Sequence, residues 1–340
     1  MCPSPVSRPQ PRPPKREARR WKAQRAQTDL RIALDGLYHG FNAHQSVNDP
    51  VWFAHRFTAG DDREVVAFIA SALAFGRVQS VLNSIEGMLE VMGPSPAAFV
   101  RGFDPSRDRK RFDHLVHRWT NGPDFAALVW ILHQMIDRSG SIERFFAEGL
   151  PAGAVDVSGG VQSFSTRALA MDVKPIYGRS KPRPGVAYFF SRPSSGGACK
   201  RLNLFLRWMV RHDRVDLGVW SKVRPGQLIV PLDTHVIRVG QCLRLTTLKS
   251  PGWRMAADIT ASLRAIDPTD PVRFDFSICH LGMMNACGFG KGTGDTRCPL
   301  KGACHPSTRR PRASARPARS EQARDVEKER GNGPLRRKQG

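Results

Sequence analysis

The sequence predicts an all-α protein, and three observations carry this expectation. Apolar residues recur at helical spacing, for example at positions 30, 34, 37 and 38. No run alternates apolar and polar residues for long enough to build a sheet. Of the 340 residues, 40% are hydrophobic, which is enough for one or two buried cores.

The expected elements follow in chain order. Asp49-Pro50 marks a turn after a first helix around residues 29–38, and the next helix, 63–75, is apolar around most of its circumference and should be buried. Segment 150–198 is rich in Gly, Pro and Ser, so we expect an irregular insertion with one short helix at 161–171. Further helices are expected at 80–92, 108–119, 123–137, 141–148, 199–212, 233–245, 252–266 and 270–286.

The chain is strongly basic, with a formal net charge of +23. Residues 1–27 hold eight basic and one acidic side chain, and residues 305–340 hold eleven basic and four acidic ones, so 28–304 keeps a charge of +9. We expect both ends to be disordered basic tails. The basic remainder favours a polyanion as ligand, because binding releases counterions, and nucleic acid is the leading class of partner.

The seven cysteines and the apolar runs indicate the compartment. The cysteine count is odd and four of them lie within 279–304, which argues against a disulfide framework. The Pro- and Arg-rich N-terminus has no secretory pattern, and no apolar run reaches 18 residues. We therefore expect a cytoplasmic, nucleoid-associated protein without a membrane partner.

Two helix starts carry residues that suit a helix cap and a phosphate site. Asp233 opens the helix at 233–245, where its carboxylate would accept the unpaired amide hydrogens of the first turn. Gly196-Gly197 precedes the helix at 199–212, and such a turn exposes backbone N–H groups that bind phosphate. On that helix Lys200, Arg207 and Arg211 fall opposite the apolar stripe, so we expect a solvated basic face.

A third cluster is rich in thiols. Cys279, Cys287, Cys298 and Cys304 lie close together in the sequence, and cytoplasmic thiols at this density usually bind a metal. They form a candidate ligand set for zinc or an iron–sulfur cluster. Asp295, His280 or His305 are alternative ligands.

These motifs resemble the endonuclease III branch of the helix-hairpin-helix DNA glycosylases. The string L-D-T-H-V-I-R-V at 232–239 is similar to the family segment V-D-T-H-V-x-R-V. In that family this Asp lies at a helix N-terminus in the cleft between two helical domains. It assists departure of the damaged base and stabilises the positive charge on the sugar. The resemblance implies that Asp233 is catalytic and that Arg238 orients the chain or binds phosphate.

The turn at 196–200 resembles the family hairpin L-P-G-V-G-x-K-T-A-N. Lys200 and Asn203 keep its K-x-x-N spacing, while the L-P-G of the hairpin is missing. The resemblance implies that Lys200 is the Schiff-base nucleophile or a phosphate contact, with Gly196, Gly197 and Arg201 beside DNA. Lys200 precedes Asp233 by 33 residues, which requires an insertion around 213–230.

The cysteines resemble the C-x6-C-x2-C-x5-C loop of the same family. Cys287 matches its first position and Cys298-x5-Cys304 its end, while the second Cys is absent. The resemblance implies a 4Fe–4S cluster, with zinc as the chemical alternative.

The segments A-F-I-A-S-A-L-A-F-G-R-V at 67–78 and D-P-V-R-F-D-F at 270–276 resemble a bacterial family of unknown function that is remotely related to these glycosylases. The resemblance covers roughly 30–304 and implies a six-helix barrel domain, 61–235, and a second helical domain formed by 28–60 and 236–304. It also places Arg77 near a DNA-contacting loop.

Together these observations predict a monomeric, DNA repair-like protein that binds duplex DNA and excises a base, with or without abasic-site lyase activity. Two alternatives stay open. One is a non-catalytic nucleic-acid-binding protein that retains the glycosylase fold. The other is a factor directed to RNA, which basic Arg-rich tails equally permit.

Overall fold

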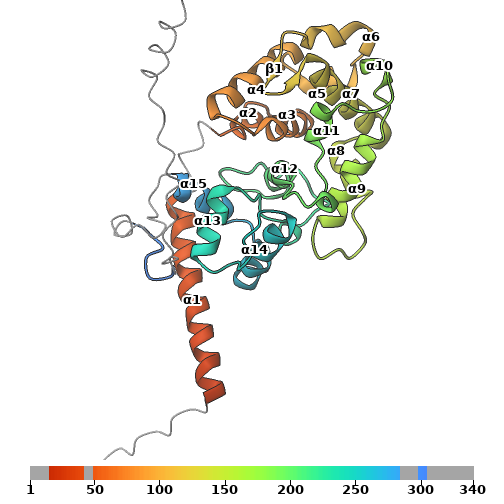
Figure 1. Cartoon of the computed structure of the whole chain (residues 1–340). Coiled ribbons are helices and arrows are strands. Elements are labelled where there is room, and N and C mark those ends of the chain that lie inside the picture. Colours follow the sequence, from red (N-terminus) through yellow and green to blue (C-terminus); the bar gives the residue numbers. More distant parts are fainter. Residues whose placement is uncertain (1–14, 42–48, 284–297, 305–340) are drawn as a thin grey trace, which may run out of the picture. The chain divides into compact units, whose positions relative to one another are not determined.

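The computed structural model describes residues 15–41, 49–283 and 298–304, all within one structural unit that extends to Pro306. These residues are mostly helical (Figure 1), which confirms the all-α class. The α-helices are α1 (Lys15–Phe41), α2 (Trp52–His55), α3 (Gly60–Leu73), α4 (Val78–Met92), α5 (Pro96–Arg101), α6 (Pro105–Asp108), α7 (Gly122–Ser139), α8 (Ile142–Ala147), α9 (Ser158–Leu169), α10 (Lys174–Tyr177), α11 (Pro184–Phe189), α12 (Lys200–Val210), α13 (Thr234–Cys242), α14 (Trp253–Ile266) and α15 (Asp275–Met283). Three 3₁₀ turns, η2 (Arg109–Phe112), η3 (Pro193–Ser195) and η4 (Pro225–Gln227), connect some of them.

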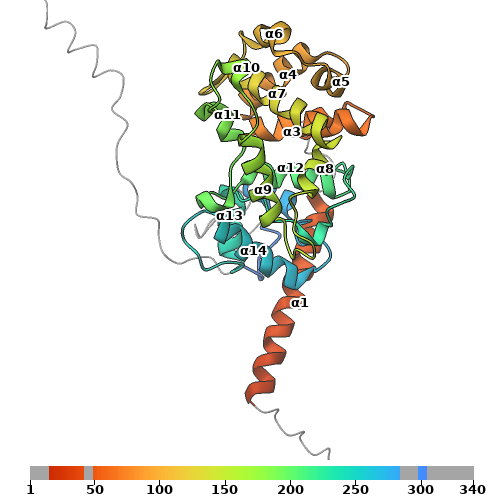
Figure 2. The ribbon, with the colours of Figure 1, turned by 90° about the vertical axis from the view of Figure 1, so that its right-hand side faces the viewer.

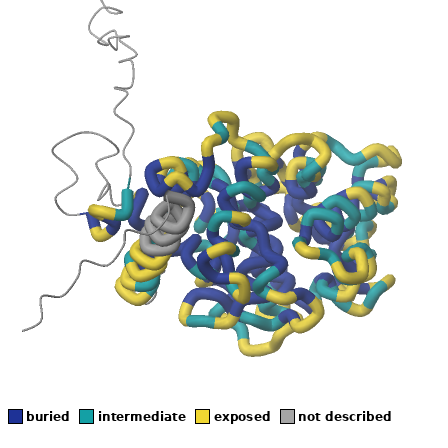
Figure 3. The backbone as a smooth tube through the Cα atoms, turned by 90° about the horizontal axis from the view of Figure 1, so that it is seen from below, coloured by how far each residue is buried: buried dark blue, intermediate teal, exposed yellow. Residues whose placement is uncertain are grey.

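Helix α3 is buried on nearly all sides, as its apolar composition predicts. Residues from Val65 to Leu73 are at most 2% exposed. The ring of Phe68 packs against Phe164, Phe190 and Phe205, with centroids 5.0 to 5.9 Å apart. Helices α2, α4, α5 and α12 contact α3. The buried residues, dark blue in Figure 3, lie inside a layer of exposed turns and helix faces.

The segment 108–119, predicted as a helix, is not one. Helix α6 ends at Asp108 and η2 at Phe112, and an antiparallel pair follows, β1 (Val116–His117) with β2 (Thr120–Asn121). The prediction was wrong because strands of two residues are too short for their alternation to be seen. Asn121 then caps α7, in a capping box with Asp124.

The segment 150–198 is more ordered than its composition predicts. It contains α9, α10, α11 and η3, and α10 and α11 pack against α7. The hydroxyl of Tyr177 donates to the carboxylate of Asp124 over 2.8 Å, which ties the segment to the start of α7. Proline is compatible with the first turn of a helix, and α10 and α11 each have one there. These prolines therefore indicate where helices begin and not where loops run.

Helix α1 begins within the segment expected to be a basic tail. The Pro-rich part ends at Pro14, and the following residues are mostly good helix formers. Leu34 and Leu37 are buried, as the apolar stripe predicts. Helix α1 contacts α15, and the two lie side by side in Figure 1. In the described part of the chain, no helix is long and apolar enough to cross a membrane.

The predicted solvated basic face on α12 is wrong for its two arginines, whereas the side chain of Lys200 is 39% exposed. Arg207 and Arg211 are 2% and 4% exposed, because α12 lies between α3 and the segments that carry Asp216 and Asp275. Figures 1 and 2 both show α12 beside α3. A helix enclosed in this way buries its polar face as well as its apolar stripe.

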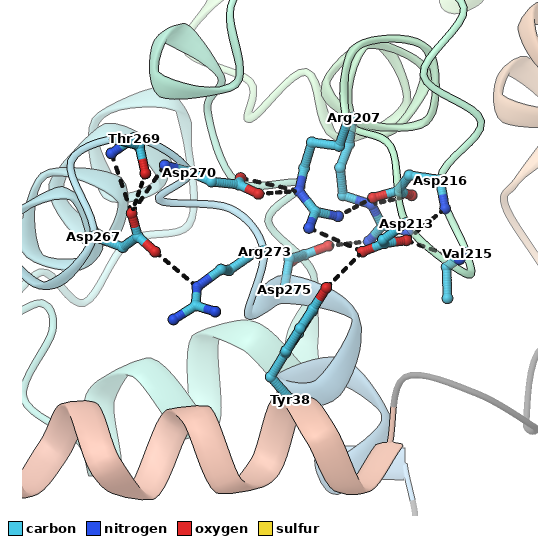
Figure 4. A network of polar contacts seen from close by, with 11 residues as sticks. Tyr38, Arg207, Asp213, Val215, Asp216, Asp267, Thr269, Asp270, Arg273 and Asp275 are labelled. Atoms are coloured by element: carbon cyan, nitrogen blue, oxygen red, sulfur yellow. Dashed lines mark hydrogen bonds and ion pairs between the residues drawn. The ribbon is translucent and has the colours of Figure 1, made fainter.

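The buried arginines are neutralised by carboxylates from two loops (Figure 4). Arg207 donates through Nε to Asp216, over 3.1 Å, and through Nη1 to Asp275, over 2.5 Å. Arg211 donates to both oxygens of Asp270, over 2.9 Å, and also bonds Asp216. This Arg–Asp network, Arg207, Arg211, Asp213, Asp216, Asp270 and Asp275, fastens α12 to the loop after it and to the start of α15.

Removing Asp216 should therefore be costly. We expect Asp216→Ala to lower the free energy of unfolding by about 3–5 kcal/mol, because two buried guanidinium groups lose a carboxylate. Urea unfolding followed by circular dichroism measures this. The control is Asp61→Ala, which breaks the exposed pair with Arg101 and should cost about 1 kcal/mol or less. An equal decrease in the free energy of unfolding in the two variants would contradict a stabilising role for the Arg–Asp network.

Candidate functional site

A cavity of about 580 Å³ lies where five segments of the chain meet. Apolar side chains form most of its wall, and charged groups gather on one part of it. The segments are 49–50, the turn after α3 with the start of α4 at 74–81, residues 200–207 of α12, the stretch 231–233, and α15. A site of this size and mixed lining is typical of small-molecule and cofactor pockets.

Asp233 is the N-cap of α13. Its backbone is extended, with φ −124° and ψ −177°, and its Oδ1 accepts the amide hydrogens of His235 and Val236 over 2.9 and 2.8 Å. The interpretation as an N-cap is thus confirmed. The side chain is 15% exposed, so the carboxylate lies near the cavity surface with little water around it.

The second oxygen of Asp233 faces two other functional groups. Lys200 Nζ lies 3.6 Å from Oδ2, and the thiol of Cys279 donates to Oδ2 over 3.1 Å. Burial raises the pKa of Asp233, but the Lys200 ammonium, the Val236 amide and the Cys279 thiol outweigh it, and the pKa lies below its usual value. The carboxylate is therefore ionised at neutral pH.

The turn before α12 brings Lys200 to this position. Gly196 and Cys199 both have left-handed backbones, with φ of +77° and +49°, and α12 begins immediately afterwards. The Gly196 carbonyl accepts from the amide of Trp253 over 3.2 Å, at the start of α14. A Cβ at Gly252 would lie 2.6 Å from that carbonyl oxygen, so this close approach requires glycine.

Helix α15 supplies another part of the wall through Phe276, Cys279, His280 and Met283. It lies close to α13, because a Cβ at Gly282 would come within 2.5 Å of the Cβ of His235. Burial, together with the charges of Asp233 and Asp275, raises the pKa of the Cys279 thiol, so the sulfur stays protonated. Burial also lowers the pKa of His280, which keeps the imidazole neutral.

Asp275 and Arg207 connect the cavity to the Arg–Asp network. Both line the cavity. Burial raises the pKa of Asp275 to about 6, although Arg207 opposes the shift. Within the described ranges, Asp275 Oδ1 and Arg207 Nη2 are buried without a hydrogen-bond partner. Such buried atoms are costly to leave unpaired.

The structure brings the two residues predicted to be catalytic, Lys200 and Asp233, together in one ion pair across 33 positions of sequence. The residues predicted to contact nucleic acid divide into two groups. The exposed ones are Gly196, Gly197, Arg77 and Arg238. The buried ones are Arg201, Arg207 and Arg211.

Arg201 is enclosed rather than exposed. It is 8% exposed and donates to the carbonyl oxygens of Ala72, over 2.9 Å, and Tyr188. Arg201 is therefore not exposed for a contact with DNA, since helical spacing does not reveal what packs over a helix. Arg77 precedes α4, next to Gly76 and Val78 of the cavity wall.

The cysteines predicted to hold a metal are described only in part. Cys279 lies in the cavity, Cys298 is buried and Cys304 is partly buried, whereas Cys287, Asp295 and His305 lie outside the described residues. Among the residues that are described, no group of three His, Cys, Asp or Glu side chains is placed to hold a metal ion. The iron–sulfur or zinc site stays a prediction.

Sequence reasoning missed two residues of the site. Cys279 was assigned only to a metal, although its thiol bonds Asp233. Asp275 belongs to the D-P-V-R-F-D-F segment at 270–276, but no function was predicted for it, although it lines the cavity and pairs with Arg207. The D-x-x-x-C spacing from 275 to 279 does put both on one face of a helix, and that was the available signal.

The comparisons give the family. The model of a family described as "Protein of unknown function (DUF2400)" matches residues 49–284, and the chain belongs to this family. Every residue of the cavity wall lies inside the matched range. Comparison with curated proteins and comparison with solved structures each gave no match.

The environment of Cys279 can be tested by alkylation. We expect iodoacetamide to modify Cys279 slowly at pH 8, because burial and nearby carboxylates disfavour the thiolate. Asp233→Asn keeps a good N-cap but removes one negative charge, and alkylation should become several-fold faster. Peptide mapping by mass spectrometry resolves Cys279 from the other cysteines. The control, Asp258→Asn, changes an aspartate outside the cavity wall and should leave the rate as it is; an unchanged rate in Asp233→Asn would refute the contact.

Proposed function

We propose that this protein binds DNA and excises a base, with Asp233 stabilising the transition state. The observation that carries the proposal is the ionised Asp233 carboxylate, held by two helix amides and faced by Lys200, at the wall of a largely apolar cavity. Cleavage of the bond between a base and C1′ develops positive charge on the sugar. A fixed carboxylate in a site of low dielectric stabilises such charge well.

The cavity suits one extruded nucleotide. Its volume of about 580 Å³ falls in the range of small-molecule sites, and apolar walls formed by Phe75, Val81, Leu204 and Phe276 would accept a flat heterocycle. An enzyme that acts on a base inside a duplex must turn the nucleotide out of the stack.

The proposed reaction breaks the bond between C1′ and the base nitrogen, and the electron pair leaves with the base. A water oxygen forms the new bond to C1′ and gives up one proton, and the departing base gains one proton at its nitrogen. In the alternative, Lys200 Nζ, after loss of a proton, forms the bond to C1′ and displaces the base. Since the pKa of Asp233 is lowered, its carboxylate keeps the negative charge that stabilises the cationic sugar, and we propose water as the nucleophile. Lys200 then contributes charge and contacts phosphate.

The exposed predicted contacts lie beside this site and support a DNA surface. Gly196 and Gly197 precede α12, and Arg77 precedes α4. Arg238 is exposed on α13. A net charge of +23 adds attraction to duplex DNA that depends on salt. Arg201, Arg207 and Arg211 are not part of the proposed contact, because they are buried.

The glycosylase-like fold is part of the same proposal. We assign 61–235 to a helical barrel domain and 28–60 with 236–304 to a second domain, in a monomer associated with the nucleoid. The segment at 232–239 supports this relation, because its Asp caps a helix at a cavity wall. A 4Fe–4S cluster or zinc on Cys279, Cys287, Cys298 and Cys304 stays a prediction, and no step above depends on it.

Asp233→Asn tests the proposed chemistry. The full-length protein is incubated with duplexes that carry uracil, hypoxanthine, alkylated or oxidised bases, and released base is measured. We expect the variant to lose excision by about a hundredfold or more, because asparagine cannot stabilise the cationic sugar. DNA affinity should stay within about twofold, since asparagine keeps the N-cap. Asp258→Asn is the matched control and should excise like the parent protein.

Treating the same reactions with borohydride separates the roles of Lys200. Trapping that disappears in Lys200→Ala makes Lys200 the nucleophile, and excision without trapping leaves water in that role. Duplex binding without base release from any substrate would contradict catalysis and support a non-catalytic binder. Preference for RNA over duplex DNA at matched salt would redirect the proposal to RNA.

A further inference from the structure

The β1–β2 hairpin is fastened to the rim of the cavity. His117 is 2% exposed, and its ring nitrogens lie 2.9 Å from the Phe75 carbonyl oxygen and 2.9 Å from Ser84 Oγ. Phe75 itself lines the cavity. These two bonds join the hairpin to the end of α3 and to α4, so the residues of its turn have a fixed place beside the cavity.

The turn of the hairpin presents an aromatic side chain to solvent. Trp119 is 52% exposed, and the preceding Arg118 has a left-handed backbone with φ +56°. Arg118 lies over Gly76, since a Cβ there would be 3.1 Å from Arg118 Cδ, and its guanidinium is 5.5 Å from the Trp119 ring centroid. A large aromatic ring with an arginine beside it is thus held outward.

Trp119 belongs to a supported cluster and does not stand alone. Its ring centroid lies 5.2 Å from that of Phe75 and 5.0 Å from that of Tyr188, which is 39% exposed. Below them, the buried Arg201 guanidinium lies 3.8 Å from the Tyr188 centroid and 5.0 Å from the Phe75 centroid. We call Phe75, Trp119 and Tyr188 the aromatic patch.

The aromatic patch is continuous with the cavity. Phe75 belongs to both, and the next wall residues, Gly76 and Val78, are exposed, with Val78 at 54%. Arg77 and Arg118 are exposed in the same region. Aromatic faces flanked by arginines are the usual surface for unpaired nucleotides, because bases stack on the rings while phosphates pair with the cations.

We propose that the aromatic patch stacks on an unpaired nucleobase next to the nucleotide that enters the cavity. The inference rests on the proposed function for its ligand class, and it adds a preference for DNA that already contains unpaired nucleotides. Trp119 supplies the stacking face, and Arg118 and Arg77 attract the adjoining phosphates. Arg201 packs against the rings of Tyr188 and Phe75 and holds the aromatic patch in place. The unpaired base stacks on the aromatic patch while the neighbouring nucleotide enters the cavity.

Fluorescence anisotropy with the full-length protein tests this. One probe is a continuous duplex, and the other is the same duplex with a three-nucleotide single-stranded gap that contains 2-aminopurine. We expect the protein to bind the gapped probe more tightly and to quench the 2-aminopurine. Trp119→Ala should lose about tenfold in affinity for the gapped probe, together with the quenching, and change by no more than about twofold on the continuous duplex.

Two further variants complete the experiment. Trp119→Phe should restore most of the affinity and quenching, because it keeps an aromatic face. Trp52→Ala removes a tryptophan of similar exposure, 42%, from α2 outside the patch, and should behave as the parent protein. If Trp119→Ala binds and quenches as the parent does, the inference is overturned while the proposed function stands. If the parent protein binds neither probe, the proposed function fails with it.

Discussion

The ion pair between Arg207 and Asp275 is the constraint on which the candidate site depends. Its two side chains are each 3% exposed, and they connect α12 to the first turn of α15. Lys200 lies two turns earlier on α12, and Cys279 one turn later on α15. A buried pair of this kind adds little net stability but penalises every arrangement that breaks it. The pair therefore fixes the spacing between the helices whose side chains meet at Asp233.

The same constraint shapes the electrostatics of the cavity. The charge of Asp233 adds to the effect of burial in raising the pKa of Asp275, whereas the contacts of Asp233 lower its own pKa. Asp233 has two helix amides, a thiol and Lys200, whereas Asp275 is buried and has Arg207 as its counterion. One carboxylate thus stays ionised well below neutral pH while the other has a pKa of about 6. Two acids of different strength in one apolar cavity are typical of catalytic sites.

Periodicity and local motifs predicted much of this structure, and packing decided the rest. Three features depend only on residues near one another in the sequence and could be predicted from it. They are the burial of α3, the N-cap at Asp233 and the apolar stripe of α1. The resemblance gave Lys200 and Asp233 a role each, but their ion pair was not predicted, because no local signal spans 33 residues. The burial of Arg207 could not be foreseen, since its partners lie in the loop after α12 (Asp216) and in the first turn of α15 (Asp275), and the positions of both depend on the whole fold. The hairpin that carries Trp119 was missed because its strands are two residues long.

A complex with a cationic abasic-site analogue tests the central claim most directly. A duplex with a pyrrolidine in place of one deoxyribose carries positive charge where the transition state does. Its crystal structure with the full-length protein should place the pyrrolidine nitrogen in the cavity, about 3 Å from an oxygen of Asp233. A duplex bound elsewhere, or a pyrrolidine left in the stack with Asp233 facing only Lys200 and Cys279, would contradict the assignment of this cavity as the catalytic site.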